Sequence, residues 1–127
     1  MTDRNLSKLN KLEQAIVDDF KTTLLKTLKD EVVLIRLFGS KARGDYHPNS
    51  DMDILVILRH KNRKIDEKLS EVEWEILEKY NFQYYISVAA YTQKEFEGFN
   101  RLETPFSQNV TKEGISLWDI SQRIRKS

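Results

Sequence analysis

Residues 32–58 read VVLIRLFGSKARGDYHPNSDMDILVIL, in which two apolar runs enclose a polar turn. The runs at residues 32–38 and 52–58 are rich in β-branched residues. Short continuous apolar runs bounded by turn residues are typical of buried β-strands. Gly39 ends the first run, and the polar residues 40–50 predict a turn, a short helix and a loop. This stretch therefore predicts two strands of one sheet.

Amphipathic patterns flank these two strands. Apolar residues recur every three or four positions over residues 9–28 and again over residues 65–80, which is the spacing of one helix face. An aromatic and β-branched run at residues 82–91 predicts a third strand. These patterns together predict a sheet on which long helices pack.

Two short signals predict further helices near the end of the chain. Thr92 and Glu95 fit a capping box, in which the side chain of each residue accepts a hydrogen bond from the backbone N–H of the other. Thr104 fits the N-cap of another helix, because Pro105 follows it at the position where a helix tolerates proline best. That helix is expected to end near Gly114.

The order of these elements predicts a single α/β or α+β domain over residues 1–127. A short edge strand at residues 115–118 would complete a small mixed sheet, which we expect helices to cover on one face. The basic residues of 121–127 are expected to form a frayed tail. A chain of 127 residues fits one domain with one core.

Composition and charge exclude several classes of protein. With 39% hydrophobic and 32% charged residues, the chain has the composition of an ordinary globular protein. The 21 Lys and Arg residues against 20 Asp and Glu residues leave a net charge of +1, which disfavours bulk binding to nucleic acid. The absence of cysteine excludes disulfides and thiolate metal sites. Because the sequence shows no apolar secretory or membrane-spanning stretch, we expect a cytoplasmic protein with no membrane partner.

Gly39 and Ser40 lie where the first strand is expected to give way to a short helix. A glycine at this point lets the backbone approach a phosphate that a Cβ atom would exclude. Ser40 adds a hydroxyl group and an amide at a helix N-terminus, and both suit the β- and γ-phosphates of a nucleotide. Lys41 and Arg43 are further candidates for phosphate contacts, although charged residues in a loop are more often solvated.

Asp51 and Asp53 are two positions apart at the start of the second strand, so their side chains are expected on the same face. Two neighbouring carboxylates repel each other, and a hard divalent cation relieves that repulsion. Mg²⁺ is commonly held by one or two carboxylates together with substrate phosphates. A phosphate turn on one strand end beside a metal pair on the next strand predicts a site for nucleotidyl transfer.

The motif at residues 39–53, a Gly-Ser turn followed by Asp-x-Asp, resembles the signature of the minimal nucleotidyltransferases of the DNA polymerase β-like superfamily. The match extends through residues 42–44 and Ser50. The order of predicted elements over about residues 5–115 also suits the fold of that family. The resemblance implies a nucleotidyltransferase fold.

Within that family the chain is similar to the MNT antitoxins that are encoded beside HEPN-domain toxins. The resemblance implies transfer of AMP from ATP to a tyrosine of the partner toxin, a ribonuclease that is thereby silenced. It also implies that Gly39 and Ser40 hold the triphosphate and that Asp51 and Asp53 bind Mg²⁺. On this interpretation the catalytic residues are Ser40, Asp51 and Asp53.

The predicted third strand departs from the family pattern. Members of the superfamily usually carry a third carboxylate there, which binds metal and accepts the proton of the attacking hydroxyl group. Residues 82–91 contain no acid, and Ser87 aligns with the position of that carboxylate. A serine is a poor base at neutral pH. Either the transferase is slow or the protein only binds nucleotide and toxin.

Three alternatives to the leading hypothesis stay open at this point. A non-catalytic antitoxin that neutralises its toxin by occlusion would explain the missing acid. Transfer to a small molecule such as an aminoglycoside is a second enzymatic reading, weakened because 127 residues leave little room for a separate acceptor domain. A nucleotide-binding subunit with no toxin is the third.

Overall fold

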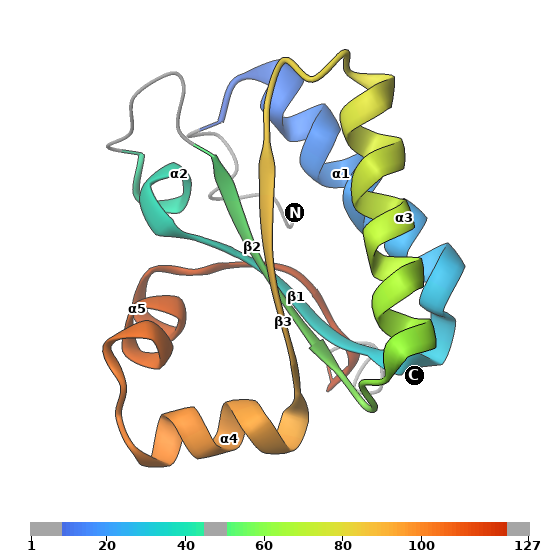
Figure 1. The fold of residues 1–127 in the computed structure, drawn as a ribbon. Helices are drawn as coiled ribbons and strands as arrows, with labels where there is room; N and C mark the ends of the chain where they lie inside the picture. Colours follow the sequence, from blue (N-terminus) through green and yellow to red (C-terminus); the bar gives the residue numbers. More distant parts are fainter. Residues whose placement is uncertain (1–8, 45–50, 122–127) are drawn as a thin grey trace.

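The computed structural model describes residues 9–44 and 51–121, and Figure 1 shows how their helices and strands are arranged. Much of the loop that the sequence predicts before Asp51, and nearly all of the predicted basic tail, lie outside these residues. The described part forms a four-stranded sheet with helices on both sides.

The sheet consists of β1 (Val32–Phe38), β2 (Met52–Leu58), β3 (Ile86–Thr92) and β4 (Ile115–Asp119), in the spatial order β3-β2-β1-β4. Strand β1 runs antiparallel to β2 and to β4, whereas β2 and β3 are parallel. The sheet is therefore mixed, and β4 is an edge strand as predicted.

The third strand begins later than the sequence predicts. It starts at Ile86 rather than at Phe82, because Asn81 and Phe82 both adopt left-handed backbone with φ of 57°. The backbone N–H of Phe82 donates to the carbonyl of Leu77 at 2.9 Å, which closes the end of the preceding helix. The aromatic residues between this turn and Ile86 therefore belong to a connection.

Helices cover both faces of the sheet, so the expectation that they cover one face is wrong. Helices α1 (Lys11–Leu28) and α3 (Arg63–Lys79) lie on one side, and α4 (Gln93–Arg101) and α5 (Pro105–Glu113) lie on the other (Figure 1). A 3₁₀ turn, η2 (Lys29–Glu31), joins α1 to β1.

The physical reason for two covered faces is the composition of β2. Its alternate side chains Ile54 and Val56 join the core under α1 and α3. Leu55 and Ile57 point to the opposite face, where they join a second cluster with Val110 of α5. A strand that is apolar on both sides is stable only when both sides are covered.

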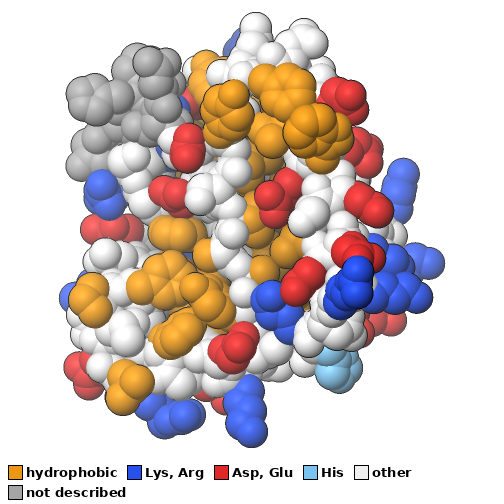
Figure 2. Space-filling view, viewed as in Figure 1, with side chains coloured by type: hydrophobic (Ala, Val, Ile, Leu, Met, Phe, Trp, Pro, Cys, Tyr) orange, Lys and Arg blue, Asp and Glu red, His pale blue; other side chains and the backbone are white. Residues whose placement is uncertain are grey.

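Both predicted helix starts near the end of the chain are confirmed. Thr92 caps α4 through a capping box with Glu95, and Thr104 caps α5, which begins at Pro105. Aromatic side chains from both helices cluster against β3, and Figure 2 shows this apolar surface over α4 and α5. Among the described helices, none combines the length and the apolar character that crossing a bilayer requires.

Candidate functional site

Gly39 lies at the junction of β1 and the single-turn helix α2 (Gly39–Arg43), with φ of +78°. Its neighbour Phe38 is the partner of Asp53 across the antiparallel pair. A Cβ atom at position 39 would overlap Oδ2 of Asp53 and lie 3.2 Å from its Cγ. The glycine therefore provides the left-handed turn and leaves the space that the Asp53 carboxylate fills.

Asp53 projects from β2 toward the face that carries α4 and α5, because it alternates in phase with Leu55 and Ile57. Burial, together with the nearby carboxylate of Asp51, raises the pKa of Asp53 above its ordinary value. Asp51 precedes β2 and is exposed. The charge of Asp51 thus disfavours ionisation of Asp53, and a shared metal site of the two stays a prediction.

These two carboxylates fit a hard divalent cation. Carboxylate oxygens are the ligands that Mg²⁺ prefers, and a cation would offset both the burial and the repulsion from Asp51 that raise the pKa of Asp53. Within residues 9–44 and 51–121, no group of three or more His, Cys, Asp or Glu side chains could hold a metal ion. The remaining ligands would then have to be phosphate oxygens and water, which is how Mg²⁺ is usually held beside nucleotides.

Ser40 follows Gly39 in the first turn of α2 and is half-buried. Its carbonyl accepts a hydrogen bond from the backbone N–H of Gly44 at 2.9 Å, which closes the turn. Gly44 itself has φ of 87°, a left-handed conformation that ends α2. The Gly39-Ser40 turn is therefore short, closed at both ends by glycine and positioned directly beside Asp53.

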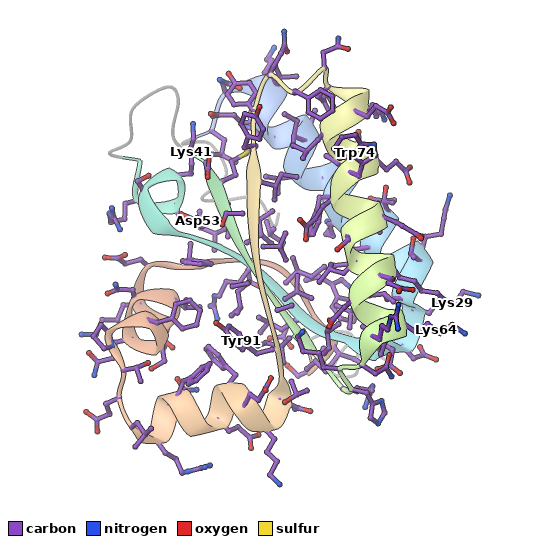
Figure 3. All side chains as sticks on the ribbon, viewed as in Figure 1. Lys29, Lys41, Asp53, Lys64, Trp74 and Tyr91 are labelled. Carbon is purple, nitrogen blue, oxygen red and sulfur yellow. The ribbon has the colours of Figure 1, made fainter. Side chains whose placement is uncertain are left out.

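Lys41 does not occupy the position that the sequence suggests. Its side chain is fully buried, with 0% exposed, and its ammonium group forms an ion pair with Glu13, whose side chain is 1% exposed. Figure 3 shows Lys41, a residue of α2, at the same end of the sheet as Asp53. A buried ammonium group held by a carboxylate is not presented to a ligand at the surface, so this arrangement does not provide the predicted phosphate contact.

Arg43 is at the surface, as a phosphate contact requires. Its Nη1 donates to Oε1 of Glu113 at 3.0 Å, and both side chains are substantially exposed. This ion pair links α2 to the end of α5 and is open to solvent, so it can exchange partners at little cost. A role for Arg43 at the phosphates stays a prediction.

Glu13 was missed at the sequence level, although its pattern carried two signals. It falls on the apolar face of the first helix, four positions after Leu9 and three before Ile16, where a charge is unusual. It also pairs with Asn10 in a capping box: the Glu13 N–H donates to Oδ1 of Asn10 at 2.7 Å, and the Asn10 N–H donates to Oε1 of Glu13 at 3.0 Å. Only the fold shows that its other oxygen binds Lys41.

Ser87 lies directly beside Asp53. The two residues are partners in the parallel pairing of β2 and β3, so their side chains point to the same face. Ser87 is exposed on the edge strand. The hydroxyl group of Ser87, the residue that we align with the third carboxylate of the family pattern, is therefore adjacent to Asp53.

Comparisons with known proteins identify relatives of this chain. Residues 17–117 match the Nucleotidyltransferase domain family. A protein of Methanocaldococcus jannaschii named "Putative protein adenylyltransferase MJ0141" is 29% identical over 102 residues, which cover 80% of this chain and 95% of that protein. A second protein of that organism, "Putative protein adenylyltransferase MJ0604", is 29% identical over 111 residues, which cover 84% of this chain and 98% of that protein.

Solved structures share the fold. A chain of a toxin–antitoxin complex with AMP-PNP has a TM-score of 0.53 and 23% identity, over 85% of this chain and 77% of that chain. A mutant of the MntA–HpeT toxin–antitoxin complex gives a TM-score of 0.52 and 21% identity over the same shares. The predicted resemblance and the predicted fold are confirmed. Since the matched residues 17–117 include the Gly-Ser turn and both aspartates, this chain belongs to the nucleotidyltransferase domain family.

Proposed function

We propose that the protein is a Mg²⁺-dependent adenylyltransferase that moves AMP from ATP to a tyrosine of a HEPN-type partner toxin, and so acts as an antitoxin. The observation that carries this proposal is the contact between the Gly39-Ser40 turn and Asp53. The turn and the carboxylate come from adjacent ends of β1 and β2, and no side chain separates them. Such a junction offers a place for phosphates next to a place for a cation.

Each residue then has a defined task. Gly39 lets the turn lie against the Asp53 carboxylate, and the amide and hydroxyl groups of Ser40 donate to the triphosphate oxygens. Asp51 and Asp53 hold the cation through their carboxylates. When bound there, Mg²⁺ would polarise the α-phosphate and offset the charge of the pyrophosphate leaving group.

The transfer step balances without a further reactant. The acceptor oxygen forms a bond to the α-phosphorus, the bond from that phosphorus to the bridging oxygen breaks, and pyrophosphate leaves. The proton of the acceptor hydroxyl goes to bulk water, because Ser87 cannot accept it at neutral pH. We therefore expect a slow transferase compared with enzymes that carry a carboxylate at this position.

Relatives support the choice of a protein acceptor. The two proteins of Methanocaldococcus jannaschii are named for transfer to protein, and this chain spans nearly their full length. A toxin–antitoxin complex with AMP-PNP shares the fold. The single domain, in which α4 and α5 occupy the face beside the site, has no separate lobe in its described part to enclose a small acceptor.

Asp53→Asn tests the proposal. The change removes charge but little volume, and burial already disfavours the charged carboxylate, so the fold should survive. We expect transfer of labelled AMP from ATP to a HEPN-type acceptor to fall by at least about 100-fold, since the cation loses a direct ligand. Full transfer by a variant that melts like the wild type would contradict the metal assignment.

A non-catalytic antitoxin is the second candidate, and the serine beside Asp53 is the observation that favours it. Under simple occlusion, Asp53→Asn would neutralise the toxin as well as the wild type does. Under the proposed transfer, the variant would lose neutralisation together with AMP transfer. Scoring toxin survival and AMP incorporation on the same samples therefore separates the two candidates.

A further inference from the structure

A buried ion pair joins the N-terminus of α1 to α2, directly behind the site. Glu13 and Lys41 are 28 residues apart in the chain, yet the Lys41 ammonium group donates to Oε2 of Glu13 and both side chains are removed from solvent. Lys41 follows Ser40 without an intervening residue, so its side chain anchors the backbone next to the phosphate turn. The pair is thus a direct mechanical link between α1 and that turn.

A tyrosine extends this link to the third strand. The Lys41 Nζ lies 5.6 Å from the ring centroid of Tyr84, and Nδ2 of Asn10 donates to the Tyr84 hydroxyl group at 3.3 Å. The carbonyl of Tyr85 accepts a hydrogen bond from the N–H of Met52 at 3.0 Å, between the two aspartates. These contacts therefore connect the start of α1, the helix α2 and the residues just before β3. All three lie at the end of the sheet that carries the site.

Stability alone does not account for this pair. A buried ion pair is often no more stable than well-packed apolar residues of the same volume, because both charges lose their hydration. Breaking such a pair is nevertheless strongly unfavourable, because it leaves an unpaired charge in the interior, so the pair disfavours arrangements in which its two partners separate. Here the arrangement that it fixes is the position of α2 relative to Asp53.

We propose that Glu13 and Lys41 are positioning residues, whose buried ion pair holds the Gly39-Ser40 turn at the distance from Asp51 and Asp53 that a triphosphate with its cation requires. The inference rests on the proposed function. Neither side chain contacts the nucleotide, and the effect is transmitted through the backbone of α2. Misplacement of catalytic groups by about 1 Å can cost about 100-fold in rate.

The test uses the double variant Glu13→Gln/Lys41→Met and measures binding of Mg²⁺ with AMP-PNP by calorimetry, below the melting transition of each protein. Each single change leaves a buried polar partner unmatched, whereas the double change removes both charges and keeps the capping oxygen of residue 13. We expect the double variant to recover much of the melting temperature that the single variants lose. Its affinity for the nucleotide should still be weaker by roughly tenfold or more.

Two further variants serve as matched controls. Lys41→Arg keeps a buried cation for Glu13 and should bind the nucleotide more tightly than Lys41→Met does. Asp19→Asn breaks another ion pair of the same helix, with Lys79 of α3 on the side away from α2, and should lower stability without changing nucleotide affinity. A loss of affinity that follows stability alone would appear in the Asp19 variant as well.

The outcomes separate this inference from the proposed function. If the wild type fails to bind AMP-PNP with Mg²⁺, the proposed function is wrong and the inference is lost with it. If the wild type binds and the double variant binds equally well, the proposed function stands and the positioning role is overturned. The positioning role is established if the double variant binds the nucleotide more weakly than the wild type. Lys41→Arg must then bind it more tightly than Lys41→Met does, and Asp19→Asn must bind it as tightly as the wild type does.

Discussion

The side chain of Gly39 is a single hydrogen atom, and only a side chain of this size lets the turn lie against the carboxylate of Asp53. We predict that Gly39→Ala weakens binding of Mg²⁺ with AMP-PNP by at least about tenfold, because the new Cβ displaces the Asp53 carboxylate. A left-handed backbone with a side chain should also cost about 1–2 kcal/mol of unfolding free energy. Calorimetry and urea unfolding measure the two effects.

Gly98 offers a matched control for that substitution. It lies within α4, where a Cβ would meet Nη2 of Arg101 at 3.7 Å, an ordinary contact and the only one with residues 9–44 and 51–121. Gly98→Ala should raise the unfolding free energy by about 0.5–1 kcal/mol and leave nucleotide binding unchanged. Equal nucleotide affinity in the Gly39 and Gly98 variants would refute the placement of the phosphates at the turn.

A substitution at Ser87 can add a ligand for the metal ion instead of removing one. We predict that Ser87→Asp strengthens Mg²⁺ binding and raises the rate of AMP transfer, because the new carboxylate would stand beside Asp53 on the same face. Ser87→Asn has the same size without the charge and should change neither quantity. Unchanged Mg²⁺ affinity in a folded Ser87→Asp protein would show that this position does not reach the metal.

Among the helices, α1 and α3 are joined at the surface by Asp19. Its carboxylate accepts hydrogen bonds from Lys79 Nζ at 2.8 Å and from the hydroxyl group of Tyr80. The hydrogen bonds from Lys79 and Tyr80 lower the pKa of Asp19 below its ordinary value. A lowered folded-state pKa means that this contribution to stability is present above the unfolded pKa and is lost as the pH falls through the folded one.

We therefore predict that Asp19→Asn destabilises the protein by about 1 kcal/mol at neutral pH, a modest value because the site is partly exposed. The difference from the wild type should shrink as the pH falls below about 4, where Asp19 begins to protonate in the unfolded chain, and should vanish below the lowered pKa of the folded protein. Urea unfolding of both proteins across this range is the measurement. A difference that is constant with pH would exclude Asp19 as its source.

At the scale of the whole molecule, the parts that could be predicted from the sequence are those encoded locally. The strands β1 and β2, the starts of α4 and α5, and the proximity of Gly39 to Asp53 all follow from patterns within a few residues or across one antiparallel pair. The late start of β3 was not visible, because the left-handed backbone at residues 81–82 leaves no trace in an apolar run.

Long-range packing accounts for the rest of what was missed. The sequence pattern predicts all helices on one face of the sheet, but α4 and α5 lie on the face opposite α1 and α3. Periodicity shows that a helix has an apolar side, but it does not show where that side packs. Lys41 was placed at the surface because its partner lies 28 residues away on another helix. The position of Glu13 on an apolar helix face is a sign of burial, but the sequence does not show that Lys41 is its partner.

The strand β2 pairs with β1 locally and antiparallel, but with β3 in parallel through the crossover that contains α3. The parallel pairing of β2 with β3 closes a longer loop than the antiparallel pairing of β1 with β2. In addition, β3 is an edge strand with few fully buried residues, whereas β2 is buried along nearly its whole length. We expect amide hydrogens of β3 to exchange with solvent faster than those of β2, and equal protection would contradict this order. The phosphate turn and the aspartates would then stay in place when β3, which carries Ser87, opens locally and briefly. The part of the site next to β3 would thus undergo local unfolding more often than the part formed by β1 and β2.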